Sequence, residues 1–174
     1  MGLADENPDQ MTRYTTLLGQ LLLALIPATL AAQSASWNTY VGGAQYDGAR
    51  AMLRTNDGGT VMAGYTGSFG PNASNQTTNC YVVKVVDEGT LSWTSFFGGN
   101  YSDELFGAAL ISDGSILVAG FTRSSSALSS EDILLARLSA DGDLLWAKRY
   151  GSSNESEYAW DLAAVGGDQF VLTG

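Results

Sequence analysis

The chain has 174 residues, of which 45% are apolar and 15% charged, a composition typical of a folded domain. Its 18 acidic and 8 basic residues give a formal charge of −10, which repels nucleic-acid phosphates and anionic membrane surfaces. Histidine is absent and Cys80 is the only cysteine. These counts exclude histidine-based catalysis, cysteine–histidine zinc sites and an intrachain disulfide framework.

The N-terminal region predicts a secretory signal peptide over residues 1–32. An apolar run at 17–32 follows Arg13 and ends in small residues, and it is too short and interrupted for a typical membrane span. An uncleaved anchor is the alternative. Because the first ten residues are acidic, Met11 is an alternative start and the residues before it are then an extension. We therefore expect a secreted or cell-surface protein with no membrane insertion after signal removal.

From residue 37 the chain repeats, with a tryptophan that recurs after 56 and then 53 residues. An acid, a turn and a glycine within an apolar run follow each tryptophan at nearly constant offsets. The recurring positions are the tryptophans Trp37, Trp93 and Trp146, the acids Asp47, Asp103 and Glu157, the turn residues Asp57, Asp113 and Gly167, and the glycines Gly64, Gly120 and Gly174. A period of this length indicates a solenoid, a propeller or an array.

Each period predicts four strands joined in an antiparallel meander. The expected strands of the two complete periods are 48–55, 60–66, 80–87, 91–97, 106–112, 115–122, 132–139 and 144–150, which are rich in apolar, β-branched and aromatic residues. The tight turns contain glycine, which tolerates positive φ. Lys84 and Arg137 are the single charges of the two third strands, which predicts one wetter position in each.

The tryptophan, the aromatic-Gly-Gly sequence, the acid, Asp-Gly-Gly and the Val-Ala-Gly-Tyr-Thr type of strand together resemble the bacterial-type β-propeller repeat families of large secreted proteins. The segment 141–146 also resembles the tryptophan-docking repeat of quinoprotein propellers, which concerns blade packing and implies no cofactor. The resemblance implies an all-β propeller of four-stranded blades over 33–174, divided at about 37–92, 93–145 and an incomplete 146–174. Propellers have four to eight blades, so the two and a half blades imply a fragment completed by further blades of a longer chain, or by other copies of the chain.

The repeated residues have structural explanations. We expect Trp37, Trp93 and Trp146 to pack between adjacent blades, with a carbohydrate-stacking role as the alternative. The recurring glycines Gly64 and Gly120 predict close approach of backbone segments near the axis. Cys80 corresponds to an isoleucine of the next repeat, which favours a buried apolar role.

The acids favour turn and loop chemistry. Asp57, Asp113 and Asp141 lie in hairpin turns, where a carboxylate can accept hydrogen bonds from local amides. The recurring acids before the first strands, Asp47, Asp103 and Glu157, leave a calcium site between neighbouring loops as the weaker alternative. No catalytic, cofactor-binding or metal-binding residue is assigned.

Four N-x-S/T sequons, at Asn72, Asn75, Asn100 and Asn154, fall in predicted loops. They predict N-glycosylation in a eukaryotic source and unmodified asparagines in a bacterial one.

The repeat favours a noncatalytic extracellular scaffold or binding module whose loops bind a polysaccharide or a protein. A carbohydrate-active propeller enzyme, and a self-assembling fibre or sheath subunit, are the alternatives. Positions that break the repeat are the best candidates for function. These are the loop from Gly67 to Asn79, the linkers that carry sequons, and Arg50 and Arg54, whose places in the next period are held by Phe106 and Leu110.

Overall fold

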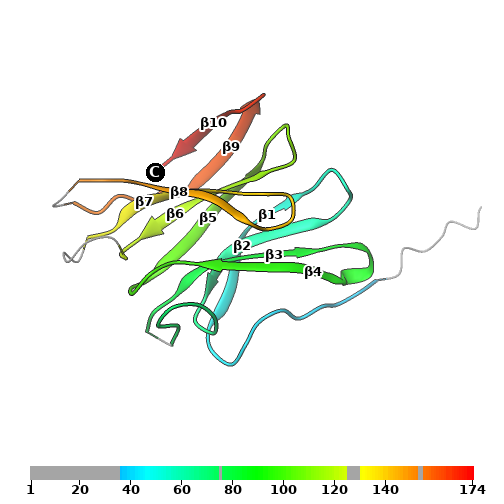
Figure 1. Cartoon of the computed structure of the whole chain (residues 1–174), viewed down its shortest axis with the longest axis horizontal. Coiled ribbons are helices and arrows are strands. Elements are labelled where there is room, and N and C mark those ends of the chain that lie inside the picture. Colours follow the sequence, from blue (N-terminus) through cyan, green and yellow to red (C-terminus); the bar gives the residue numbers. More distant parts are fainter. Residues whose placement is uncertain (1–35, 75, 125–129, 153–154) are drawn as a thin grey trace, which may run out of the picture. The chain divides into compact units, whose positions relative to one another are not determined.

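The computed structural model describes residues 36–74, 76–124, 130–152 and 155–174, and nearly all of the regular structure in them is β-strand (Figure 1). The elements are β1 (Asp47–Arg54), β2 (Thr60–Thr66), β3 (Asn79–Val85), the short 3-10 turn η1 (Asp87–Gly89), β4 (Leu91–Phe97), β5 (Asp103–Leu110), β6 (Ile116–Thr122), β7 (Asp132–Leu138), β8 (Leu144–Tyr150), β9 (Asp161–Gly166) and β10 (Gln169–Thr173). The predicted all-β class is confirmed.

The strands form three open antiparallel sheets. The first has the order β1-β2-β3-β4 and the second has the order β5-β6-β7-β8, so each predicted period is a sequential four-stranded meander. The third sheet contains β9 and β10. The predicted strand ranges agree with the observed ones to within three residues at each end.

The sheets pack face to face through their first strands. β5 contacts β1, β2 and β3, and β9 contacts β5 and β6. Alternation along the strands gives each sheet two apolar faces, so Val61 of β2 and Val118 of β6 meet in one core between the first two sheets. Leu117 points the opposite way and packs with Leu162 of β9 in a second core.

The longer loops lie at one end of the strands. The pairing aligns Asp47 with Thr66, Thr66 with Asn79 and, one residue further along β3, Cys80 with Phe97. The described loop residues 43–46, 67–74, 76–78, 98–102, 123–124, 130–131, 151–152 and 155–156 therefore lie at the same end of the strands, which we call the loop edge. Tight turns connect the strands at the opposite edge, where Gly58 and Gly114 adopt φ of 84° and 85°.

The expected wetter position of the third strands is wrong for Lys84. Its residue is only 6% exposed, and its ammonium group donates to Asp57 Oδ2 over 2.6 Å. Arg137 donates to Asp113 Oδ2 over 2.7 Å in the second sheet. The turn acid of each sheet thus reaches the charge of the third strand, which allows that charge to lie under the hairpin.

Several predictions fall outside the described residues. These are the signal peptide over 1–32, the alternative start at Met11, and the sequons at Asn75 and Asn154. Within the part of the chain that the structure describes, no helix is long and apolar enough to cross a membrane.

Candidate functional site

The first strands of the two complete sheets each contain a β-bulge. The register shifts between Ala49 and Ala51 in β1, and between Leu105 and Gly107 in β5. The extra residues are Arg50 and Phe106. A bulge redirects the side chain of its extra residue, so these two repeat-equivalent side chains project at the same point of each sheet.

The repeated glycines make room for the bulges. A Cβ at Gly120 would lie 2.8 Å from Cα of Leu105 and closer still to the carbonyl oxygen of Glu104. A Cβ at Gly64 would lie 2.9 Å from Cα of Ala49, in the equivalent contact of the first sheet. Gly174 approaches the carbonyl group of Tyr158, so the third repeat has the same close approach. These glycines are needed because a backbone segment crosses over them.

Aromatic rings surround Phe106. Its ring centroid lies 5.9 Å from that of Phe121 and 5.0 Å from that of Trp160, which directly precedes β9 and corresponds to Phe106 in the repeat. Tyr158 stacks on Trp160 with centroids 5.3 Å apart and planes inclined by 14°, and it meets Phe121 edge-on at 5.4 Å. Such contacts between rings are favourable in tilted and offset geometries.

Arg50 extends the cluster into the first sheet. Its guanidinium carbon lies 5.0 Å from the ring centroid of Tyr65 and 4.9 Å from that of Phe106, within cation–π range of both. One guanidinium nitrogen donates to Glu104 Oε2 over 3.1 Å. Glu104 Oε1 accepts a hydrogen bond from the Thr78 hydroxyl over 3.3 Å.

Glu131 fixes the Tyr158 end of the aromatic cluster. Burial and a hydrogen bond to Glu131 raise the pKa of Tyr158. Glu131 also accepts hydrogen bonds from Arg123 and from Ser156. Burial alone would raise the pKa of Glu131, but these hydrogen bonds outweigh it and hold the pKa below its ordinary value. The carboxylate therefore anchors the Tyr158 ring.

The cluster forms one contiguous and partly exposed surface, which we call the bulge surface. Trp160 is 56% exposed, and the side chains of Arg50 and Glu104 are 43% and 17% exposed. The members of the bulge surface are Arg50, Tyr65, Glu104, Phe106, Phe121, Tyr158 and Trp160.

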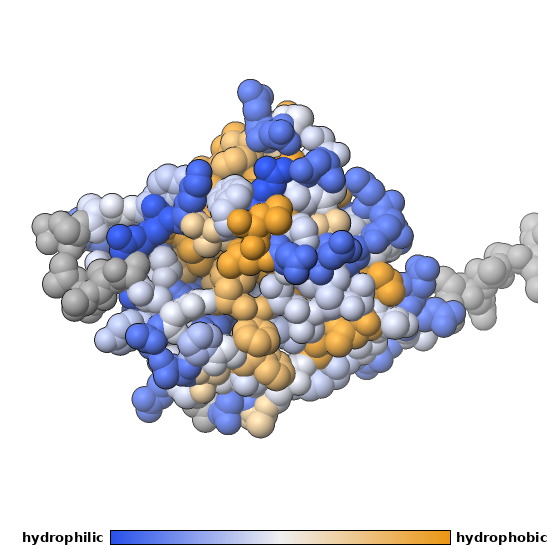
Figure 2. Space-filling model, in the orientation of Figure 1, coloured by the Kyte–Doolittle hydropathy of each residue, from blue (hydrophilic) through white to orange (hydrophobic). Residues whose placement is uncertain are grey.

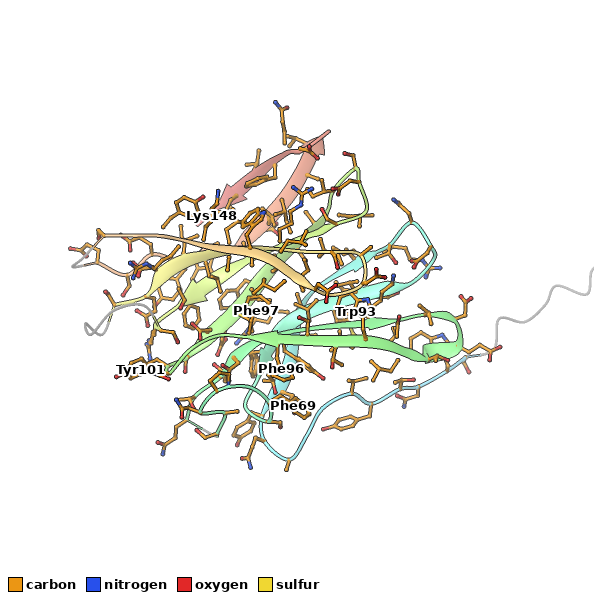
Figure 3. All side chains as sticks on the ribbon, in the orientation of Figure 1. Phe69, Trp93, Phe96, Phe97, Tyr101 and Lys148 are labelled. Atoms are coloured by element: carbon orange, nitrogen blue, oxygen red, sulfur yellow. The ribbon has the colours of Figure 1, made fainter. Side chains whose placement is uncertain are left out.

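The repeated tryptophans lie elsewhere, and two of them pack against turns. Trp93 of β4 donates from Nε1 to the carbonyl oxygen of Ala140 over 3.1 Å, and a Cβ at Gly142 would lie 2.7 Å from its ring. Figure 3 shows Trp93 and Phe97 on the side of β4 that faces β8, whereas Phe96 lies on the other side with Phe69. Trp93 therefore packs between the first two sheets.

The other two tryptophans differ in their contacts. Trp37 lies over Gly89 of η1, the turn between β3 and β4, where an added Cβ would be 2.8 Å from Cδ2 of the ring. Trp146 of β8 packs against the second core, and the ammonium nitrogen of Lys148 lies 5.2 Å from its ring centroid. None of the three belongs to the bulge surface.

The recurring acids before the first strands tie down loops. Asp47 accepts hydrogen bonds from Gly43, Thr66 and Ser68; Asp103 accepts them from Gly99 and Ser124; and Glu157 accepts them from the backbone and side chain of Ser152. At least one oxygen of each carboxylate is thus taken up by loop amides and hydroxyls. Among residues 36–74, 76–124, 130–152 and 155–174, no group of three histidine, cysteine, aspartate or glutamate side chains could hold a metal ion.

The turn acids bind both the local backbone and the third strand. Asp57 Oδ1 accepts from the Gly59 amide over 3.2 Å, and Asp113 Oδ1 accepts from the Ser115 amide over 2.9 Å. Asp141 donates its own amide to the Ser139 hydroxyl over 3.2 Å. Hydrogen bonding places the pKa values of Asp57 and Asp113 below the ordinary range, first through Lys84 for Asp57 and through Ser115 for Asp113.

Two crevices lie outside the bulge surface, since none of its members lines either one. The first, of about 230 Å³, lies between residues 39–41 and the first sheet; the second, of about 370 Å³, lies between 97–99 and the second sheet. The second is lined by Asp103, whose Oδ1 atom is buried without a hydrogen-bond partner. Buried acceptors of this kind usually bind water.

The remaining sequence candidates lie in the core or on the loop edge. Cys80 is fully buried in the core between the first two sheets, and burial raises the pKa of its thiol. Asn72 donates from Nδ2 to Asn100 Oδ1 over 3.0 Å, so two sequons meet on the loop edge. Arg54 ends β1 next to the turn at the opposite edge, away from Arg50.

Sequence reasoning selected Arg50 and missed its partners. The signal for them is positional: Phe106 and Trp160 stand three residues after the recurring acid, as Arg50 does, and Tyr65 and Phe121 each follow the recurring glycine. Aligning the periods at the acid would have identified this set.

Comparison of the chain with protein-family models and with curated proteins gave no match.

Proposed function

We propose that this chain is a noncatalytic binding module of a secreted or cell-surface β-propeller, and that its bulge surface binds polysaccharide. Support for the propeller comes from the two four-stranded meanders and from β5 and β9, the first strands of the second and third sheets, each of which packs against the preceding sheet. The apolar run at 17–32 supports secretion. Further blades of a longer chain, or other copies of the chain, would complete the ring.

The observation that carries the proposal is the bulge surface. Sugar rings have apolar C–H faces and a polar rim of hydroxyls, so they bind where exposed aromatic faces lie beside hydrogen-bonding groups. Trp160 offers an exposed ring and Arg50 with Glu104 offers donors and an acceptor. The rings come from three successive repeats, so an extended glycan can contact several of them at once.

The charge of the chain favours an uncharged polymer over nucleic acid, because a formal charge of −10 opposes polyanions. On the face drawn in Figure 2, apolar residues form a band bordered by hydrophilic ones. Outside the bulge surface, Leu91, Phe96 and Leu145 of the outer strands are also exposed and are available for contacts with neighbouring blades or copies. Glycans at Asn72 or Asn100 would stand on the loop edge in a eukaryotic source.

A glycan array and a hydrolysis screen on the full secreted protein test the proposal. We expect Trp160→Ala to weaken binding of the best glycan about tenfold, which corresponds to about 1.4 kcal/mol. Tyr101→Ala is the matched control, because this ring is 55% exposed but lies in the 98–102 loop outside the bulge surface. Its binding should equal that of the wild type.

Three results would contradict the proposal. Equal affinities of the wild type and Trp160→Ala would remove the bulge surface as the binding site. Cleavage of the glycan, abolished by Glu104→Gln, would establish a hydrolase instead. Binding of a protein ligand with no glycan bound would assign the surface to protein recognition.

A further inference from the structure

We propose that Arg50 and Glu104 form a receptor for two adjacent hydroxyls of a neutral sugar, and that this pair makes the module select neutral polysaccharides over uronate polymers. The inference rests on the proposed function, because it specifies which glycan the bulge surface binds.

The charge of Arg50 is compensated by a carboxylate of the protein itself. Its guanidinium group bonds Glu104 Oε2 over 3.1 Å, and among the residues described only this carboxylate accepts from it. An arginine beside a carboxylate is already electrostatically compensated, so it offers little attraction to a second anion. The carboxylate also repels the carboxylate of a uronate directly.

Arg50 and Glu104 both keep hydrogen-bonding groups that a ligand can use. Tyr65 and Phe106 flank the guanidinium at 5.0 and 4.9 Å, so ligand groups reach it through its in-plane N–H donors. Glu104 has lone pairs beyond those used by Arg50 and Thr78. The pair therefore presents donors next to an acceptor. Two neighbouring sugar hydroxyls have the same complementarity, because each hydroxyl both donates and accepts.

The place of Arg50 within the repeat puts it beside the aromatic rings. Arg50, Phe106 and Trp160 occupy equivalent places, and only the first is polar. Phe106 contacts both of the others, at 4.9 and 5.0 Å. A glycan chain that stacks on Phe106 and Trp160 thus brings its next sugar to Arg50. The aromatic rings supply sequence-tolerant contact, and the single polar position supplies selectivity.

The test uses matched glycans that differ only in having a hydroxymethyl group or a carboxylate at C6, such as cellohexaose and its C6-oxidised form. The glycan array first identifies the neutral backbone that binds, and its matched pair is then measured by calorimetry at low and high salt. We expect the wild type to bind the neutral member at least about tenfold more tightly, with little dependence on salt. A form of the neutral glycan lacking one hydroxyl of the recognised pair should also bind at least about tenfold more weakly.

Variants separate charge from geometry. Glu104→Gln keeps an acceptor but removes the charge, so the preference for the neutral glycan should fall about tenfold and binding of the uronate form should become salt-dependent. Arg50→Lys keeps the charge without the planar fork and should weaken neutral binding about tenfold. Arg54→Lys is the matched control, because Arg54 lies at the far end of β1, and it should bind like the wild type.

The outcomes distinguish this inference from the proposed function. A wild-type protein that binds the uronate member more tightly, with strong salt dependence, would overturn the inference and leave glycan binding intact. Equal binding of the deoxy and parent glycans would overturn it as well. Absence of binding to every glycan, or no loss in Trp160→Ala, would instead overturn the proposed function. The comparisons on the wild type require no variant, so an unstable variant leaves the inference testable.

Discussion

Replacing Gly120 with alanine tests whether the repeated glycine is required by the bulge. The added Cβ would stand 2.8 Å from the carbonyl carbon of Glu104 and 2.8 Å from Cα of Leu105, where about 3.4 Å is the shortest ordinary contact. The carbonyl oxygen of Glu104 would lie closer still and all three neighbours are backbone atoms, so β5 must move by more than about 1 Å against the core between the first two sheets. Overpacking against backbone costs about 3 kcal/mol.

Urea unfolding measures this loss. With a slope of about 2 kcal/mol per molar urea, the midpoint should fall by about 1.5 M. Gly114→Ala is the control: Gly114 has φ of +85° and no atom within 4 Å of an added Cβ, so only conformational strain of about 1 kcal/mol is expected. A loss in Gly120→Ala no larger than in Gly114→Ala would refute the steric argument, since the bulge would then yield without cost.

Three further outcomes follow from the packing. Trp93→Phe should lower the free energy of unfolding by about 1–2 kcal/mol, because the hydrogen bond to the Ala140 carbonyl is lost, and urea unfolding measures the change. The pKa of Asp57 is lowered first by its hydrogen bond from Lys84, so its stabilisation is present above pH of about 4 and is lost as the pH falls further; Asp57→Asn should flatten the acid branch of a plot of melting temperature against pH. Cys80 should react with a thiol reagent only at the rate of unfolding, and rapid labelling of the native protein would contradict its burial.

The strands were predictable because each one carries its own local signal. β2 is β-branched and apolar on both faces, as expected for a strand that packs on the second sheet through one face and on Val41 and Phe69 through the other, and glycines bound it on each side. The order of strands followed from short connections, which favour antiparallel neighbours. These features depend on residues that are close in sequence.

The pairing of Lys84 with Asp57 could not be predicted in the same way. Asp57 lies in the turn between β1 and β2 whereas Lys84 lies on β3, and a lone charge in a strand ordinarily indicates a wet position. In the sheet the hairpin brings the Asp57 carboxylate to within 2.6 Å of the ammonium group, which lets Lys84 lie buried. Lys84 can lie buried because of this tertiary contact, and the hydrophobic periodicity of the sequence carries no information about such contacts.

At the bulge surface the backbone is constrained, whereas the side chain is free to vary. Gly64, Gly120 and Gly174 are constant because each must admit a backbone segment, and this constraint makes them visible as a repeat. The bulge residue itself projects away from the core, so packing does not determine its side chain. Its place is therefore occupied by arginine, phenylalanine and tryptophan in successive repeats.

The variable side chain at the bulge indicates a binding site more closely than the irregular loops do. Loops differ between repeats in both length and sequence, so a difference in a loop carries little information about binding. At the bulge, by contrast, the backbone geometry is fixed and only the side chain varies, so Arg50, Phe106 and Trp160 are three side chains presented by one rigid frame. Rigid presentation lowers the entropic cost of binding, because the groups are already ordered before a ligand arrives. A repeat that fixes its backbone through glycine and leaves one position free is thus suited to building a binding surface one side chain at a time.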